Sequence, residues 1–285
     1  MTARSLDHLV LPTRGIAAAR ARLTALGFTV APDGIHPFGT ENCCVYLADG
    51  AFLEPLAVAD PAIAESAAQG GNVFVARDRT FRAARGQEGF SALVLATDDA
   101  DEDHERLAAA GLSAGGMLTF SRPFSDASGK TGTATFKLAF GAAEHVPDGF
   151  FFTCERVGVP AVDRASLQRH ANGAVRVAEV TLAGNDALPL LDAIGRFVGS
   201  QAPGDVRLAG CVVSALDRRA FEAAYGIERA DDAPPFAAIT FGVSDLRKVE
   251  AVLAEGGVAS RRAGKRLIVP VAPGQGAVFA FEASA

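Results

Sequence analysis

Two ionisable side chains stand in apolar, strand-like segments near the amino end of the chain. His8 lies in the segment LDHLVL, and Glu54 lies in the segment FLEPL. Successive side chains of a strand point to opposite faces, so His8 is predicted to share a face with Leu6 and Val10. An imidazole and a carboxylate that meet in one hollow can ligate a metal ion or transfer protons. We therefore expect this pair to converge.

Other polar side chains could complete such a site. His36 and Asn42 belong to the segment HPFGTEN, where a histidine could instead fix the loop and an asparagine could form a turn. Glu155 follows a run of three phenylalanines, and burial beside them would raise the pKa of its carboxyl group toward that of a general base. Arg156 could instead pair with Glu155 and give it a structural role.

Two single cations stand among apolar residues in the second quarter of the chain. Arg122 lies in FSRPF and Lys137 in TFKLAF. Either could hold a substrate carboxylate, and an arginine would do so with two parallel hydrogen bonds. The structural alternative is a surface arginine and a lysine whose aliphatic stem covers apolar surface.

An internal repeat indicates how these residues are positioned. The segments LDHLVL and FSALVL align without a gap, and each is followed by about three helical turns, a glycine and further strand-like runs. Two later segments, VAEVTL and FAAITF, begin copies of the same pattern. The sequence thus predicts four βαβββ modules, at residues 5–58, 89–157, 174–216 and 236–283. Helical linkers are expected at residues 62–85 and 216–226.

Composition narrows the class of protein. The chain has 285 residues, 49% of them hydrophobic and 21% charged, with a formal net charge of -6 and no basic run. Clustered positive charge is needed for phosphate contacts, so a nucleic acid is not an expected partner. No stretch of about 18 apolar residues indicates a membrane span, and we expect no membrane partner. The four cysteines lack metal-binding spacing, which favours reduced thiols and a cytoplasmic location.

Three motifs in order, with Asp-His in the first strand, HPFGTEN before the third and an inward glutamate in FLEPL, resemble the vicinal-oxygen-chelate (glyoxalase-like) superfamily. Its members include glyoxalase I, bleomycin-resistance proteins and extradiol ring-cleaving dioxygenases. The resemblance implies an α+β protein in which four βαβββ modules pair into two cupped, incomplete-barrel mixed sheets with helices outside. It further implies an N-terminal domain, residues 1–160, with the site, and a degenerate C-terminal domain, residues 161–285.

The resemblance also implies a metal site in the N-terminal cup. His8 and Glu54 match the positions of the superfamily's first-strand and fourth-strand ligands. The implied ion is divalent (Zn, Fe, Mn or Ni) and acts as a Lewis acid that stabilises an enediolate or an oxyanion. Glu54 or Glu155 is then the expected general base. In the second module, Ala92 takes the place of His8 and Thr153 that of Glu54, so two of the usual four ligands are present.

Two functions remain open on this evidence. The first is a metal-dependent lyase, isomerase or dioxygenase acting on a small oxygenated molecule, and the motifs around His8 and Glu54 favour it. The second is a metal-free protein that only binds a small ligand, which the missing second histidine favours. The C-terminal half is expected to be structural or to form a homodimer. The residues expected to contact the substrate are His36, Asn42, Arg122, Lys137, Thr153 and His170.

Overall fold

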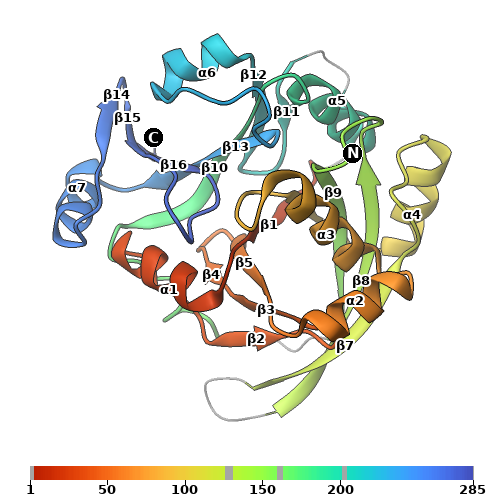
Figure 1. Ribbon diagram of the computed structural model, residues 1–285. Coiled ribbons are helices and arrows are strands. Elements are labelled where there is room, and N and C mark those ends of the chain that lie inside the picture. The colour runs from red at the N-terminus through yellow and green to blue at the C-terminus, as the bar shows by residue number, and fades with distance from the viewer. Residues whose placement is uncertain (1–2, 126–130, 159–162, 201–203, 285) are drawn as a thin grey trace.

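The computed structural model describes residues 3–125, 131–158, 163–200 and 204–284. Its strands form two mixed sheets, one in each half of the chain, with helices packed outside them (Figure 1). The predicted α+β fold built from βαβββ modules is confirmed.

The N-terminal half contains the first two modules and a helical linker. The first module comprises β1 (Leu6–Pro12), α1 (Ile16–Ala25), β2 (Asp33–Ile35), β3 (Thr40–Cys43), β4 (Val45–Tyr46) and β5 (Phe52–Val58). The linker forms α2 (Pro61–Gln69) and α3 (Val73–Arg85), as predicted. The second module comprises β6 (Ala92–Ala96), α4 (Ala100–Ala109), β7 (Leu118–Ser125), β8 (Thr131–Ala142) and β9 (Phe150–Val157).

The C-terminal half repeats this plan with fewer strands, seven against nine. Its third module comprises β10 (Ala174–Ala183), α5 (Ala187–Val198), β11 (Val206–Arg207) and β12 (Val212–Leu216). The predicted second linker forms α6 (Arg218–Tyr225). The fourth module comprises β13 (Phe236–Val243), α7 (Leu246–Glu255), β14 (Arg261–Ala263), β15 (Arg266–Val269) and β16 (Val278–Ala283).

The two modules of each half join through their first strands. The N-terminal sheet has nine strands in the order β2-β3-β5-β1-β6-β9-β8-β7, with β4 paired to β5. β1 lies parallel to β5 and antiparallel to β6, so it is the central strand where the modules meet. The C-terminal sheet has seven strands in the order β11-β12-β10-β13-β16-β15-β14, joined in the same way through β10 and β13.

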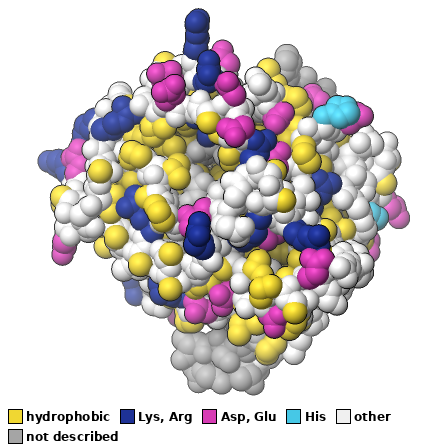
Figure 2. Space-filling model, viewed as in Figure 1, with side chains coloured by type: hydrophobic (Ala, Val, Ile, Leu, Met, Phe, Trp, Pro, Cys, Tyr) yellow, Lys and Arg dark blue, Asp and Glu magenta, His cyan; other side chains and the backbone are white. Residues whose placement is uncertain are grey.

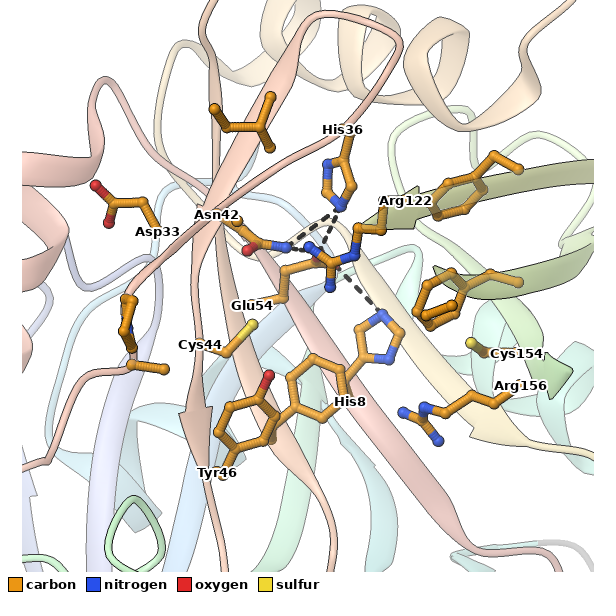
Figure 3. Close-up of a pocket in the computed structure, with 18 of the residues that line it drawn as sticks. His8, Asp33, His36, Asn42, Cys44, Tyr46, Glu54, Arg122, Cys154 and Arg156 are labelled. Atoms are coloured by element: carbon orange, nitrogen blue, oxygen red, sulfur yellow. Dashed lines mark hydrogen bonds and ion pairs between the residues drawn. The ribbon is translucent and has the colours of Figure 1, made fainter. Parts of the chain in front are cut away.

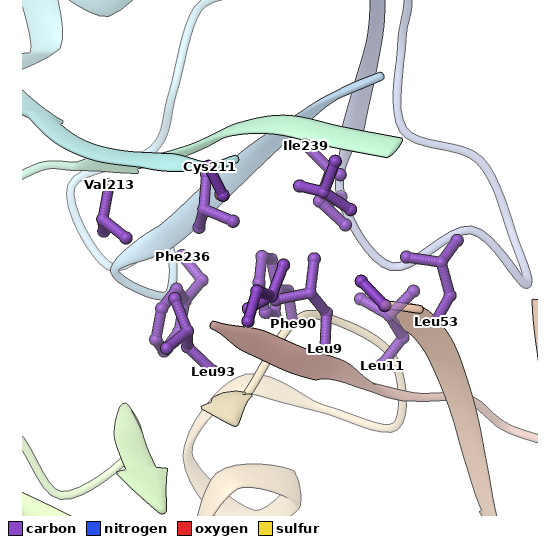
Figure 4. Close-up of a cluster of buried hydrophobic side chains, with 14 of the residues drawn as sticks. Leu9, Leu11, Leu53, Phe90, Leu93, Cys211, Val213, Phe236 and Ile239 are labelled. Carbon is purple, nitrogen blue, oxygen red and sulfur yellow. The ribbon is translucent and has the colours of Figure 1, made fainter. Parts of the chain in front are cut away.

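The central strands are buried on both faces, which explains why the sequence reads as continuous apolar runs there. Leu9 and Leu11 of β1 point into a core shared with the C-terminal sheet, whereas Val10 between them points into the N-terminal cup. Across the shared core, Phe90 stacks on Phe236 with ring centroids 4.5 Å apart (Figure 4). The back of each sheet therefore provides the other's hydrophobic contact.

The helix of the second linker fills the C-terminal cup, whereas the helices of the first linker leave a cavity in the N-terminal cup. Helix α6 places Phe221 and Tyr225, both fully buried, inside the C-terminal cup among apolar strand residues. The Tyr225 hydroxyl group hydrogen-bonds Thr181 at 2.7 Å and accepts a hydrogen bond from Arg266 at 3.1 Å. By contrast, α3 covers the N-terminal cup with Phe74 at its edge, and a cavity remains beneath it.

The predicted domain boundary falls between residues 160 and 161, which lie outside the described residues. One continuous hydrophobic cluster contains side chains from both sheets, so the halves share a core even though each has its own sheet. The division into two domains at that point stays a prediction.

The surface mixes charges of both signs. On the face shown in Figure 2, lysine and arginine side chains are interspersed with aspartate and glutamate rather than gathered in one patch. Among the described helices, none is both long enough and apolar enough to cross a membrane.

We predict that Phe236→Ala lowers the free energy of unfolding by about 3–5 kcal/mol, because it leaves a cavity at the contact between the two sheets. Urea denaturation followed by circular dichroism measures this change. Leu188→Ala in α5 is the control: that side chain is 69% exposed, and its loss should cost less than about 0.5 kcal/mol. A cost near that of the control for Phe236→Ala would contradict a core shared by the two halves.

Candidate active site

The N-terminal cup encloses a cavity of about 750 Å³. This volume is in the range of pockets that bury a small organic molecule. Its walls come mainly from the cup-facing side chains of β1, β3, β5 and β7–β9, and from the loops around residues 31–38 and 163–167. Nine of the 27 lining residues carry aromatic rings. His36, Asn42, Glu54 and Arg122 lie close together at the centre of the view in Figure 3. The aromatic members are His8, His36, Phe38, Tyr46, Phe52, Phe74, Phe120, Phe136 and Phe152.

A β-bulge at the start of β1 brings two acid-base residues together. Leu6 pairs with Leu95 and His8 pairs with Val94, so Asp7 is one extra residue on β1. A bulge re-aims side chains that would otherwise alternate. Asp7 Oδ1 therefore lies 2.5 Å from His8 Nδ1, and Leu6 joins the core shared with the other sheet instead of the cup. The prediction that Leu6 and His8 share a face was wrong for this reason.

His8 is held between two carboxylates. Its Nε2 lies 3.3 Å from Glu54 Oε2, opposite the contact of its Nδ1 with Asp7. The imidazole stacks on Phe52 with ring centroids 4.5 Å apart and meets the edge of Phe152. His8 and Glu54 are only 5% and 6% exposed, so their charges are stable there only because they are paired. The expected convergence of these two side chains is confirmed.

The loop before β3 and β3 itself supply further polar contacts to Glu54 and its neighbours. Asn42 Nδ2 donates to Glu54 Oε1 at 2.6 Å and lies 3.3 Å from His36 Nε2. His36 Nδ1 lies 2.8 Å from Thr40 Oγ1. Gly39 turns the loop at φ 82°, where a Cβ would lie 2.6 Å from the Ala64 nitrogen, so only glycine fits. This turn places His36 and Asn42 against the free side of Glu54.

Burial and the neighbouring charges together determine the pKa values of Glu54, His8 and His36. Burial alone would raise the pKa of Glu54, but hydrogen bonds from His8 and Asn42 and the nearby imidazoles lower it to about 2. Burial alone would lower the pKa of His8, but Asp7 and Glu54 hold it above its ordinary value. Burial lowers the pKa of His36 to about 4. At neutral pH the cavity thus contains the carboxylate of Glu54 and the neutral imidazole of His36, and the two carboxylates beside His8 favour its protonated form.

Asp7 also binds Arg156 through two parallel contacts of 2.8 and 2.6 Å. Burial opposes the charge on Asp7, yet the hydrogen bond and charge of His8 and the charge of Arg156 lower its pKa. The alternative in which Arg156 or Arg169 pairs with Glu155 is not what the structure shows for Arg156, since its partner is Asp7. Asp7 and Arg156 were not singled out as site residues. The adjacent Asp-His pair was the available signal, but simple alternation placed Asp7 on the opposite face.

Two predicted site residues of β9 point away from the cavity. Val10 pairs with Glu54 in the first module and Val94 pairs with Phe152 in the second, so Phe152, and not Thr153, takes the place of Glu54. This one-residue difference reverses the faces. Thr153 is buried behind the sheet, and Glu155 Oε2 accepts a hydrogen bond from the Ala100 nitrogen at the start of α4.

Two further predicted contacts also lie elsewhere. Lys137 of β8 points outside the cup, where its Nζ lies 2.5 Å from Asp101 Oδ2. His170 Nδ1 accepts a hydrogen bond from the Thr29 nitrogen at 3.0 Å, and its Nε2 lies 2.9 Å from the Tyr46 carbonyl oxygen. His170 therefore fastens a linker to the first module. His36, Asn42 and Arg122 do line the cavity, and their roles in binding stay predictions.

The residues present do not form the superfamily's complete metal centre. In the described part of the chain, no group of three or more His, Cys, Asp or Glu side chains has an arrangement that could hold an ion. His8 and Glu54 supply one module's two ligands, while the second module offers the methyl group of Ala92 and the ring of Phe152. Glu54 Oε1 already accepts from Asn42. Two ligands fall short of the three or four usual for a catalytic metal.

Within the described residues, the fold and the cavity define a βαβββ cup protein with an open cavity in its N-terminal half. The model of a glyoxalase-like domain matches residues 6–195. The chain therefore belongs to the glyoxalase-like family of the vicinal-oxygen-chelate superfamily. No curated protein sequence matches the chain.

Solved structures share the fold at low sequence identity. A hypothetical protein from Staphylococcus aureus is 12% identical with a TM-score of 0.64, covering 99% of this chain and 100% of its own. A mutant of 4-hydroxymandelate synthase from Streptomyces coelicolor is 14% identical with a TM-score of 0.64, covering 99% and 93%. Catechol 2,3-dioxygenase is 11% identical with a TM-score of 0.53, covering 100% and 89%. At these identities the likeness concerns the fold alone.

We predict that His36 stays neutral at every pH above about 5, because its pKa is lowered from 6.5 to about 4. The unfolded chain then binds a proton that the native protein does not, so stability falls as the pH drops from 6.5 toward 4. An NMR titration of the five histidines measures this directly, and His36→Asn assigns the signal. A His36 signal that titrates near 6.5 would show that water reaches this imidazole and would contradict the prediction that burial lowers its pKa.

Proposed function

We propose that this protein is an enzyme that transfers a proton at a carbon beside a carbonyl group of a small oxygenated molecule bound in the N-terminal cavity. The observation that carries the proposal is the position of His8 between two carboxylates inside a cavity lined in part by aromatic rings. A paired imidazolium and carboxylate of this kind can stabilise an oxyanion and accept a proton in the same step.

His8 would act as the electrophile. Its Nδ1 is occupied by Asp7, so only the Nε2 hydrogen is free to turn from Glu54 to a substrate oxygen. Asp7, which is itself held by Arg156, favours the protonated imidazole and orients it, as a second carboxylate does for other catalytic histidines. Negative charge that develops on the carbonyl oxygen would then meet a hydrogen-bond donor already in place.

Glu54 would act as the general base. Its pKa of about 2 in the free enzyme makes it a weak base, and the hydrogen bond and charge of His8 contribute to that low value. Once the substrate oxygen takes the Nε2 hydrogen of His8, Glu54 Oε2 loses this partner and becomes more basic. The C–H proton moves to Oε2 while Asn42 still holds Oε1. The result is an enolate paired with a protonated Glu54.

These groups favour a lyase or an isomerase among the reaction types of the superfamily, since proton transfer needs only side chains that the cup contains. Ring cleavage by a dioxygenase needs a redox metal, for which His8 and Glu54 offer two ligands. His36 Nε2 lies 3.7 Å from Glu54 Oε1.

The second candidate function is binding without chemistry. It is favoured by Ala92 and Phe152, which make the second module's side of the cup apolar. The two functions differ in what Glu54 does: an enzyme needs its carboxylate for turnover, whereas a binding protein needs only a compatible shape.

We predict that the protein exchanges the α-hydrogens of small carbonyl compounds for deuterium in D₂O, and that Glu54→Gln slows this exchange by about 10²–10⁴-fold because the base is lost. Proton NMR of a panel of aldehydes, ketones and 2-oxo acids measures the rates. Glu105→Gln, at an exposed position of α4, is the matched control and should exchange as fast as the original protein. Equal rates in the two variants would favour the binding protein.

We predict that protein purified without chelator and dialysed retains well below one equivalent of Zn, Fe, Mn or Ni, because the donor set is incomplete. Elemental analysis of the original protein, His8→Ala and Glu54→Ala makes the test. One equivalent of metal that both variants lose would instead establish a metal-dependent enzyme and contradict the donor count.

A further inference from the structure

The cavity has a cation that its own walls do not neutralise. Arg122 of β7 is half-buried and lines the cavity, and within the described residues it has no carboxylate within ion-pair distance. Its guanidinium carbon lies 5.5 Å from the centre of the Phe136 ring. Figure 3 shows the Arg122 side chain directed toward His36, Asn42 and Glu54.

Most of the other charges of the cavity wall are engaged, and Arg164 lies over the ring of Tyr46. Glu54 is bound by His8 and Asn42, and Asp33 pairs with Arg20 at 2.5 Å. Arg156 is taken by Asp7. A guanidinium left without an anion in an enclosed space is costly unless a ligand supplies the negative charge.

Arg122 stands beside the groups that we assign to the chemistry. A Cβ added to Gly34 would lie 2.5 Å from both Arg122 Nη1 and Asn42 Oδ1, so these two side chains are neighbours across that glycine. The positive charge of Arg122 also contributes to the lowered pKa of His36. An anion bound here would lie within a few atoms of the carbon that reacts at Glu54.

The rest of the wall is shaped for a flat apolar body. Phe120 stacks on Phe136 with centroids 5.1 Å apart, and Phe38 meets the face of His36 at 5.0 Å. Aromatic walls of this kind favour planar partners, which stack or meet them edge to face.

We infer that the substrate is a short organic carboxylate with a planar apolar body, whose carboxylate is bound by Arg122 next to the reacting carbon. Arg122 is thus a specificity-determining residue. An arginine is suited to this role because its planar fork matches a carboxylate with two parallel hydrogen bonds. The inference rests on the proposed function for the place of the reaction, but anion binding can be measured without turnover.

Phenylacetate and its neutral analogue phenylacetamide are the probes, and isothermal titration or ligand-observed NMR gives their dissociation constants. The original protein should bind the acid at least tenfold more tightly than the amide, because only the acid forms charge-assisted hydrogen bonds. Arg122→Gln should remove this preference with little effect on the amide. Circular dichroism of the variant checks that the fold is kept.

Two further arginine variants serve as controls for Arg122→Gln. Arg164 lines the same cavity, but its guanidinium carbon lies 4.4 Å from the centre of the Tyr46 ring, so Arg164→Gln should change the preference less than threefold. Arg247→Gln, at an exposed position of α7, should leave it unchanged. Equal binding of acid and amide by the original protein, or loss of the preference in Arg164→Gln but not in Arg122→Gln, would overturn the inference.

Glu54→Gln separates this inference from the proposed function. That variant should keep or strengthen the binding of phenylacetate while it loses hydrogen exchange. If exchange of neutral carbonyl compounds depends on Glu54 but no carboxylate is preferred, the proposed function stands and the role of Arg122 is wrong.

Discussion

A series of four interacting side chains, from the partly exposed Arg156 through the buried Asp7 and His8 to the buried Glu54, connects the strands of the N-terminal cup. Each charge is compensated by its neighbours. Asp7, His8 and Glu54 can therefore lie in a largely apolar interior, where burial of any one of these charges alone would be costly. The three strands that supply it, β1, β5 and β9, are adjacent or one strand apart around β1 and β6. The same contacts that fix the sheet therefore also set the protonation of the site, and removing one carboxylate would disturb both.

The repeat in the sequence was sufficient to predict the fold. Apolar strands, helices ended by glycine and later strand runs recur at regular places. The structure contains both predicted helical linkers and has the modules in the predicted order. Within the first module the site was also predictable, because the alternation of FLEPL puts Glu54 in the cup. Hydrophobic pattern determines these features directly, since a strand must turn its apolar side chains to a core.

The rest of the site depended on single-residue shifts that pattern does not reveal. One extra residue in β1 turns Asp7 toward His8, and a one-residue difference in the pairing of β9 turns Thr153 and Glu155 away from the cavity. Both shifts reverse the face of a side chain without changing the composition of its strand. Likewise, Lys137 and Arg122 looked alike as single cations among apolar residues. Only the register separates them, since Lys137 faces Asp101 outside and Arg122 faces the cup.

The difference between the two halves lies in their linkers as much as in their strands. In the C-terminal cup, Glu179 stands at the position of His8, but Arg266 and Ser214 satisfy it, and Tyr225 of α6 occupies the space where a ligand would lie. A cup filled by its own linker gains hydrophobic burial and gives up a binding site. The α2–α3 linker instead stays at the rim of the N-terminal cup, so that half leaves its aromatic wall and Arg122 accessible from the cavity. One half thus stabilises the molecule through the shared core, and this frees the other half to keep an open, charged cavity.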